Sequence, residues 1–228
     1  MTYFLAVDFG TINAFTAISI TRRVERFQKQ TATPGTPAYL RERRTIVSGY
    51  ENTYLQRAEQ GMAYPQVLKN VQAMLNSPQL SGKTELIFDA TGVGVGIVQQ
   101  ARDMGMSPVP ITITGGNQVT VNTDLGGYNV PKRDLVMSLI LAFQNHRIQI
   151  AQSPHRANLK DELQAFRMKM KKTGNETYEN YRDSDHDDLV LSLAMGIWYP
   201  EHIFGSVVQG DKFERTEEAE YDPLRYDL

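Results

Sequence analysis

Tyr3-Phe-Leu-Ala-Val-Asp8 is an apolar run that ends in a carboxylate, and Glu85-Leu-Ile-Phe-Asp89 repeats this pattern later in the chain. Both runs predict short buried strands, because continuous apolar runs bounded by polar or turn residues are typical of strands inside a core. An ionised carboxylate at the edge of a hydrophobic core is unfavourable unless a positive charge compensates it. The two runs therefore predict a place where acidic side chains meet a cation, and a divalent metal ion fits that need.

A third acidic group, Asp185-His-Asp-Asp188, precedes a strongly apolar stretch near the C-terminus. This stretch predicts a helix that begins around Asp187 and is apolar nearly all round, so the helix must be buried. The face that Asp187 shares is the more apolar one, which favours Asp187 over Asp188 as the carboxylate that points inward. In the alternative interpretation, Asp185, Asp187 and Asp188 only complement the positive end of the helix dipole, which is a common arrangement.

The rest of the chain alternates strands and helices. Residues 3–8 and 14–21 predict an opening hairpin and residues 45–54 a third strand, followed by a helix at 64–75, a strand at 85–89, a helix at 97–104, a strand at 109–114 and a helix at 131–145. This order favours a layered α/β fold whose later strands run parallel to the first. If strands 3–8 and 85–89 are parallel neighbours, Asp8 and Asp89 leave the sheet at the same end, on chains about 4.8 Å apart.

Composition limits the possible classes of protein. With 228 residues and 41% hydrophobic content, we expect one compact domain over residues 1–200, followed by an acidic tail over residues 201–228. Because the chain has no cysteine, any metal must be held by oxygen or imidazole. Neither a signal peptide nor an apolar run of about 20 residues is present, so we expect an intracellular protein that is not secreted and has no membrane partner.

The net charge of −2 gives no general attraction to nucleic acid, so DNA binding would have to come from local basic patches. Phe166-Arg-Met-Lys-Met-Lys-Lys172 alternates apolar and basic residues, which predicts a strand that presents Arg167, Lys169 and Lys171 on one face. With a turn after Lys172 and a return strand at 177–181, this segment forms a basic hairpin suited to a phosphate backbone. The alternative is an ordinary solvated strand face. Residues 22–44 are expected to form a loop whose arginines make a second patch.

Four segments together resemble the C-terminal nuclease domain of phage terminase large subunits. They are Val7-Asp-Phe-Gly10, Phe88-Asp-Ala-Thr-Gly-Val-Gly94, Val130-Pro-Lys-Arg-Asp-Leu135 and His186-Asp-Asp-Leu-Val-Leu-Ser-Leu-Ala194. The resemblance covers about residues 3 to 199. It implies a ribonuclease H-like α/β fold with a mixed central sheet of five or more strands flanked by helices, to which the basic hairpin is added. It also implies an endonuclease that cuts double-stranded DNA during viral genome packaging in the host cytoplasm.

The resemblance implies a site with two Mg²⁺ or Mn²⁺ ions. In the family the metal-binding acids lie on the first strand, the fourth strand and the last helix, which match Asp8, Asp89 and Asp187 or Asp188. One ion activates a water molecule and the other stabilises the leaving 3′ oxygen. Asp185 and His186 lie beside this group; His186 could move a proton or contact a phosphate, although a histidine next to a helix start is more often structural. The predicted DNA contacts are Lys132, Arg133, Arg167, Lys169, Lys171 and Lys172.

Several alternatives remain open at the level of sequence. Terminase large subunits carry an ATPase domain before the nuclease, so the chain is either an excised domain or a stand-alone relative. The implied partners are a packaging ATPase domain and the portal protein, which the acidic tail would contact. Val7-Asp-Phe-Gly-Thr-Ile-Asn13 also resembles the phosphate loop of actin-like ATPases and sugar kinases, although those proteins need two copies of the fold. A junction-resolving nuclease and a non-catalytic DNA-binding motor module are the remaining alternatives.

Overall fold

The computed structural model describes residues 2–11, 14–29, 44–172 and 187–205, with the backbone alone for 26–29, 44–46 and 167–172. In this part of the chain, eight strands form a single mixed sheet in the order β6-β7-β5-β4-β1-β2-β3-β8. The strands are β1 (Tyr3–Asp8), β2 (Ala17–Lys29), β3 (Arg44–Arg57), β4 (Thr84–Asp89), β5 (Val109–Thr114), β6 (Thr120–Asn122), β7 (Gly127–Pro131) and β8 (Ile148–Ile150). The helices are α1 (Tyr64–Leu75), α2 (Gly94–Asp103), α3 (Lys132–Gln144), α4 (Arg156–Lys172) and α5 (Asp188–Phe204). The predicted α/β class is confirmed.

β1 occupies the middle of the sheet and decides where the acidic residues lie. It pairs antiparallel with β2 and parallel with β4, with Tyr3 opposite Thr84 and Val7 opposite Phe88. The parallel pairing that the sequence predicted is therefore present. Because the two strands run in the same direction and in register, Asp8 and Asp89 both stand at the carboxyl ends of neighbouring strands, where ligands commonly bind in α/β sheets.

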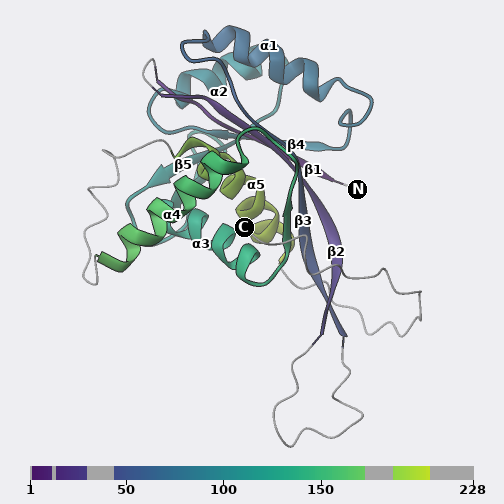
Figure 1. Ribbon diagram of the computed structural model, residues 1–228. Helices are drawn as coiled ribbons and strands as arrows, with labels where there is room; N and C mark the ends of the chain where they lie inside the picture. Colours follow the sequence, from purple (N-terminus) through teal and green to yellow (C-terminus); the bar gives the residue numbers. More distant parts are fainter. Residues whose placement is uncertain (1, 12–13, 30–43, 173–186, 206–228) are drawn as a thin grey trace, which may run out of the picture.

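Helices cover both faces of the sheet (Figure 1). α1 and α2 lie on one face, and α3, α4 and α5 lie on the other. The side chains of β1 alternate between two cores, because successive residues of a strand point to opposite faces. Phe4 and Ala6 join the core beneath α3, α4 and α5, whereas Leu5 and Val7 join the core beneath α1 and α2. Burial on both faces explains why this strand is apolar throughout.

α5 is buried along most of its length, as its apolar sequence predicted. It packs across β1 and β2 and against α3. Small residues bring it close to the sheet: the Ser19 hydroxyl donates a hydrogen bond of 2.9 Å to the carbonyl of Ser192. A Cβ on Gly196 would lie 3.5 Å from the Thr21 hydroxyl, at ordinary van der Waals distance, so the helix lies directly against the sheet here. This contact fixes the helix that carries the third acidic group.

The loop predicted for residues 22–44 is wrong in its first part. β2 continues to Lys29 and pairs with β3 from Arg44 onward, so the two strands form a long antiparallel ribbon that extends beyond the body of the sheet (Figure 1). The arginines at its base are engaged within the protein: Arg22 forms an ion pair with Glu51, and Arg23 donates to the Ser48 hydroxyl. Cross-strand partners of this kind outweighed the polar composition on which the loop prediction rested.

The basic hairpin predicted from Phe166 is also wrong, because residues 166–172 belong to α4. The decisive pattern lies upstream: Leu159 and Phe166 are buried and Leu163 is partly buried against the same core. Their spacing is that of one helix face, and the alternation after Phe166 is too short to override it. The predicted return strand at 177–181 lies outside the described residues.

Near the C-terminus, α5 extends past the predicted domain boundary at residue 200 and ends at Phe204. Gly205 then adopts a positive φ of 72°. The rest of the predicted acidic tail, residues 206–228, lies outside the described residues. Within the part of the chain that the structure describes, no helix combines the length and apolar character that crossing a membrane requires.

Candidate metal centre

Asp8 and Asp89 lie in direct contact at the carboxyl ends of β1 and β4. Both side chains are buried, each 8% exposed. When it is protonated, the Asp8 carboxyl donates a hydrogen bond to the carboxylate of Asp89. Among the described residues, neither carboxyl forms an ion pair with a lysine, arginine or histidine. The pair thus brings two buried carboxyl groups together without a direct ion pair to a described cationic side chain.

The electrostatics of this pair follow from burial and from like charge. Burial raises the pKa of Asp8 well above its ordinary value, and the neighbouring charges of Asp89 and Asp187 raise it further. Burial also raises the pKa of Asp89, against hydrogen bonds from Thr91 and the charge of Lys132, which act to lower it. Two carboxyl groups of this kind resist simultaneous ionisation until a cation joins them.

The turn after Asp89 holds this side chain in place. The backbone N–H of Thr91 donates a hydrogen bond of 2.8 Å to Asp89 Oδ1, and the Thr91 hydroxyl accepts one of 2.8 Å from the N–H of Ile113 on β5. Gly94, the first residue of α2, passes so close that a Cβ there would lie 2.1 Å from the Asp89 carbonyl oxygen. The chain therefore passes from the end of β4 directly into α2, and the close approach of Gly94 fixes the end of the strand.

Asp187 occupies the N-cap position of α5 but makes no side-chain capping hydrogen bond. Its carboxylate is partly exposed and forms an ion pair with Lys132, the first residue of α3. The Lys132 ammonium also lies 5.5 Å from the centre of the Phe166 ring, within the range of a cation–π contact. The charge of Asp187 affects the pKa of Asp8 more strongly than that of Asp188 does. Asp187 is thus close enough for its charge to act on Asp8, and its own carboxylate is paired with a lysine.

Asp188 points into a different, more buried environment. The guanidinium of Arg57, at the end of β3, donates to both of its oxygens, with Nε–Oδ2 at 2.7 Å and Nη2–Oδ1 at 3.1 Å. The same Nη2 donates to Oε1 of Glu162 at 2.6 Å, and the Arg57 guanidinium lies 4.7 Å from the centre of the Phe15 ring. The prediction that Asp187 takes the more buried face is wrong: Asp188 is 6% exposed, whereas Asp187 is only partly buried.

The donor set suits a hard divalent cation. The described side chains that converge here offer carboxylate oxygens, which Mg²⁺ and Mn²⁺ prefer over nitrogen or sulfur. As the side chains lie, no three acidic or histidine residues in the described ranges are close enough together to hold one ion. Asp8 and Asp89 are in contact, but Lys132 and Arg57 engage Asp187 and Asp188. The Asp8–Asp89 pair at the strand ends fits a metal ion. For Asp187 or Asp188 to become a third ligand, its carboxylate would have to leave its ion pair with Lys132 or Arg57.

The other predicted site residues divide into two groups. Arg133 is partly exposed beside Asp134, and its Nε lies 3.2 Å from Asp134 Oδ1. The side chains of the remaining predicted DNA contacts are not described, although their backbones belong to α4 (Arg167, Lys169, Lys171 and Lys172). Asp185 and His186 lie outside the described residues. The predicted roles of all these residues therefore remain predictions.

Sequence reasoning missed two residues that the fold brings to the acidic group, Arg57 and Glu162. Arg57 lies at the end of β3, where a charged residue after a strand carries no distinctive signal. Glu162 is 6% exposed on the inner face of α4. Glu162 stands at helical spacing between Leu159 and Phe166, so it is a charged residue on an apolar helix face. This pattern identifies Glu162 once the segment is known to be a helix.

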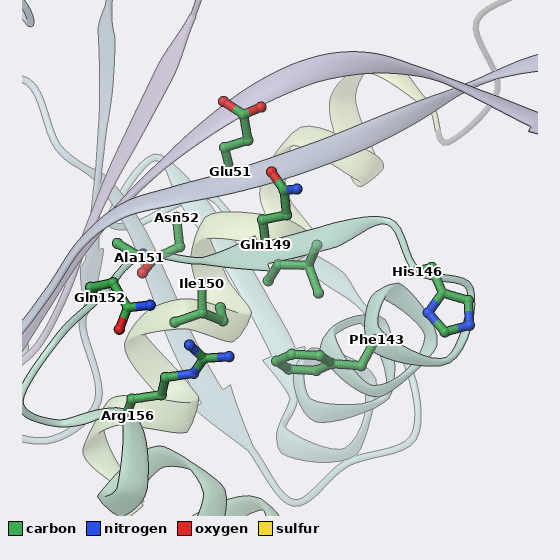
Figure 2. A pocket seen from close by; sticks show the side chains of 10 residues that line it. Glu51, Asn52, Phe143, His146, Gln149, Ile150, Ala151, Gln152 and Arg156 are labelled. Carbon is green, nitrogen blue, oxygen red and sulfur yellow. The ribbon is translucent and has the colours of Figure 1, made fainter. Parts of the chain in front are cut away.

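A separate cavity of about 390 Å³ lies between β3, β8 and the neighbouring ends of α3 and α4 (Figure 2). It is lined by Glu51, Asn52, Phe143, His146, Ile148, Gln149, Ile150, Ala151, Gln152 and Arg156. None of the predicted metal-binding or DNA-binding residues is among them. The acidic group is therefore distinct from this cavity, which we do not assign to the same chemistry.

The order of the strands, the helices on both faces and the acids at the ends of β1 and β4 define a ribonuclease H-like α/β fold, which confirms the fold expected from the sequence. No protein-family model matches the chain, and no curated protein matches it. Among solved structures, the chain is similar to the large terminase nuclease from thermophilic phage G20c, with 17% sequence identity and a TM-score of 0.50. The match covers 86% of this chain and 80% of that one. The similarity shows a terminase nuclease-like fold.

Proposed function

We propose that this chain is a metal-dependent endonuclease that cuts double-stranded DNA during viral genome packaging. The observation that supports this most strongly is the pair of buried carboxyl groups, Asp8 and Asp89, which are in contact at the ends of parallel strands and form no ion pair with a described cationic side chain. Such an arrangement is unfavourable on its own and becomes favourable when a divalent cation binds. The likeness in fold to a terminase nuclease supports the choice of reaction.

We assign metal binding to Asp8, Asp89 and Asp187. When bound, two Mg²⁺ or Mn²⁺ ions would supply an activated water and stabilise the leaving 3′ oxygen of the cut strand. Asp8 and Asp89 contribute the two oxygens that are already in contact, and the turn at Thr91 keeps Asp89 directed toward Asp8. Asp187 contributes the third carboxylate, from a position whose charge already acts on Asp8.

Asp188 has a different role in this proposal. Both of its oxygens accept hydrogen bonds from Arg57, so its charge is compensated inside the protein. We therefore place Asp188 behind the metal ligands, where it anchors the start of α5. Lys132 holds Asp187 by an ion pair, and it would contact a phosphate of the DNA when Asp187 turns toward the metal. Arg133 and the basic residues of α4 remain proposed DNA contacts.

The proposed partners follow from the proposed nuclease function. The substrate is double-stranded DNA, and the proposed protein partners are a packaging ATPase domain and the portal protein, in the host cytoplasm. The net charge of −2 means that DNA affinity in the isolated chain depends on local basic side chains and falls with added salt. Attachment to a motor would raise the local concentration of DNA at the site.

Plasmid digestion tests this proposal. Wild-type protein is incubated with supercoiled plasmid and Mg²⁺, Mn²⁺ or EDTA, beside Asp8→Asn and Asp89→Asn. We expect cutting with either metal, none with EDTA, and a loss of about 100-fold or more in each variant, because each substitution removes a metal-binding charge. Metal-dependent cutting at the wild-type rate in both variants would contradict the assignment. Asp103→Asn, on the exposed end of α2, is the matched control and should retain full activity.

A further inference from the structure

The start of α5 is capped by a residue from another helix. Asp187 occupies the N-cap position, where an aspartate usually accepts a hydrogen bond from the backbone of its own first turn. Here it accepts none. The backbone N–H of Val190, in that first turn, donates instead to Oε2 of Glu162 on α4, at 3.0 Å. Glu162 thus takes over the capping function that Asp187 would otherwise serve.

The other oxygen of Glu162 completes the arrangement. Oε1 accepts a hydrogen bond from Arg57 Nη2 at 2.6 Å, and Arg57 in turn binds both oxygens of Asp188. Three elements that are distant in the sequence, β3, α4 and α5, are therefore joined at one point. The side chains of Arg57, Glu162 and Asp188 are 11% or less exposed, so these hydrogen bonds are shielded from water.

From this geometry we propose that Glu162 and Arg57 are positioning residues that leave the carboxylate of Asp187 available to a divalent cation. The inference rests on the proposed function and extends it. A carboxylate that caps its own helix has one oxygen committed to backbone N–H groups and is a poorer metal ligand. With Glu162 on Val190, the Asp187 side chain makes no capping hydrogen bond and instead forms an ion pair with Lys132.

Arg57 has the complementary task of holding Asp188 away from the cation. Two adjacent carboxylates on one helix start would otherwise compete for the same ion and repel each other. The guanidinium fork binds both oxygens of Asp188, a geometry that a lysine cannot reproduce with its single ammonium group. The pair of contacts therefore separates two neighbouring aspartates into one anchor and one ligand.

The test is Mn²⁺ binding by isothermal titration calorimetry, at one fixed pH, with the folded state of each variant checked by urea unfolding. Glu162→Ala removes the cap and should weaken Mn²⁺ binding by about 10-fold or more, the range found for residues that orient metal ligands. Glu162→Gln keeps a carbonyl oxygen for the Val190 N–H and should bind within about 3-fold of wild type. Arg57→Lys should weaken binding while the protein remains folded.

A double substitution shows whether Glu162 acts through Asp187. In an Asp187→Asn background, Glu162→Ala should weaken Mn²⁺ binding no further, because the ligand that Glu162 releases is already gone. Glu201→Gln is the matched control: it removes a partly buried ion pair with Arg147, of 2.7 Å, at the other end of the same helix. It should lower stability and leave Mn²⁺ affinity unchanged.

The outcomes separate the two proposals. Wild-type affinity in folded Glu162→Ala or in Arg57→Lys would overturn the positioning role while leaving the metal site intact. A loss in Glu201→Gln as large as that in Glu162→Ala would also overturn it, since any weakening of α5 would then suffice. Wild-type protein that binds no Mn²⁺ and cuts no plasmid would instead overturn the proposed function.

Discussion

At the scale of single residues, the acidic group consists of carboxylates with opposite environments. Asp188 is buried but forms an ion pair with Arg57, whereas Asp8 and Asp89 are buried beside each other and form no ion pair with a described cationic side chain. Removing one partner of the first arrangement would destabilise the metal-free protein, whereas the second arrangement opposes folding whenever both groups are ionised. The expected effects of substitution therefore differ in sign between the two places.

Asp8→Asn should stabilise the metal-free protein, by on the order of 1 kcal/mol, because it removes a desolvated charge next to Asp89. Urea unfolding in EDTA measures this change in the free energy of unfolding. Asp103→Asn, an exposed carboxylate that accepts a hydrogen bond from Gln99, should change stability by less than about 0.5 kcal/mol. Destabilisation by Asp8→Asn in EDTA would show that the Asp8 charge is compensated in the metal-free state.

The stability of the metal-free protein should also fall as the pH rises. Burial raises the pKa of Asp8 and Asp89 above their ordinary values, and it raises the pKa of Glu162 from 4.5 to about 8. A folded state with raised carboxyl pKa values holds protons more tightly than the unfolded chain, so its advantage is complete below the unfolded pKa and is lost as pH rises through the folded one.

Urea unfolding in EDTA at several pH values measures this trend. Between pH 4.5 and about 8, we expect a decline on the order of 1 kcal/mol per pH unit. Added Mg²⁺ should reduce the decline, since the cation binds the ionised carboxylates. A rise in metal-free stability over this pH range would contradict the burial argument.

At the scale of elements, the turn between β4 and α2 sets the position of Asp89. Gly94→Ala would place a Cβ 2.1 Å from the Asp89 carbonyl oxygen, so we expect a loss of about 1 to 3 kcal/mol in stability and weaker Mn²⁺ binding. Gly96→Ala is the matched control in the same helix, where a Cβ meets nothing within 4 Å. It should be neutral or stabilising by about 0.5 to 1 kcal/mol. Equal stability of the two variants, measured by urea unfolding, would contradict the close approach.

The elements also show what the sequence could and could not predict. α1 and β5 have the predicted bounds, Tyr64–Leu75 and Val109–Thr114, because their apolar patterns are long and periodic. β8 has only three residues, too few for a periodic signal, and it was not predicted. The alternation after Phe166 predicted a strand, but residues 166–172 continue α4. The helix face formed by Leu159, Leu163 and Phe166 decides the structure of this segment.

The residues of the acidic site also divide into those that the sequence predicted and those that it did not. Asp8 and Asp89 were predicted to meet if the apolar runs that they end are parallel neighbours, and the sheet pairs these two strands in that way. Arg57 and Glu162 were not found, since their partners come from three elements that meet only in the folded chain. The relative burial of Asp187 and Asp188 was predicted wrongly, because the packing of α4 and β3 against the start of α5 decides it.

At the scale of the whole molecule, the fold brings three distant parts of the chain together at the carboxyl ends of the central strands. β1 and β4 contribute the central pair, and the start of α5 contributes Asp187, held across the sheet by contacts to β2 and β3. The fold is similar to that of a terminase nuclease, and the proposed chemistry depends on whether these three carboxylates share cations.

A crystal structure with Mn²⁺, solved with anomalous diffraction data, is the most direct measurement of this claim. We predict anomalous density between Asp8 and Asp89, with the Asp187 carboxylate turned from Lys132 toward the ion and Asp188 still bound to Arg57. Mn²⁺ density found only elsewhere on the protein, with Asp8 and Asp89 still sharing a proton, would contradict the account.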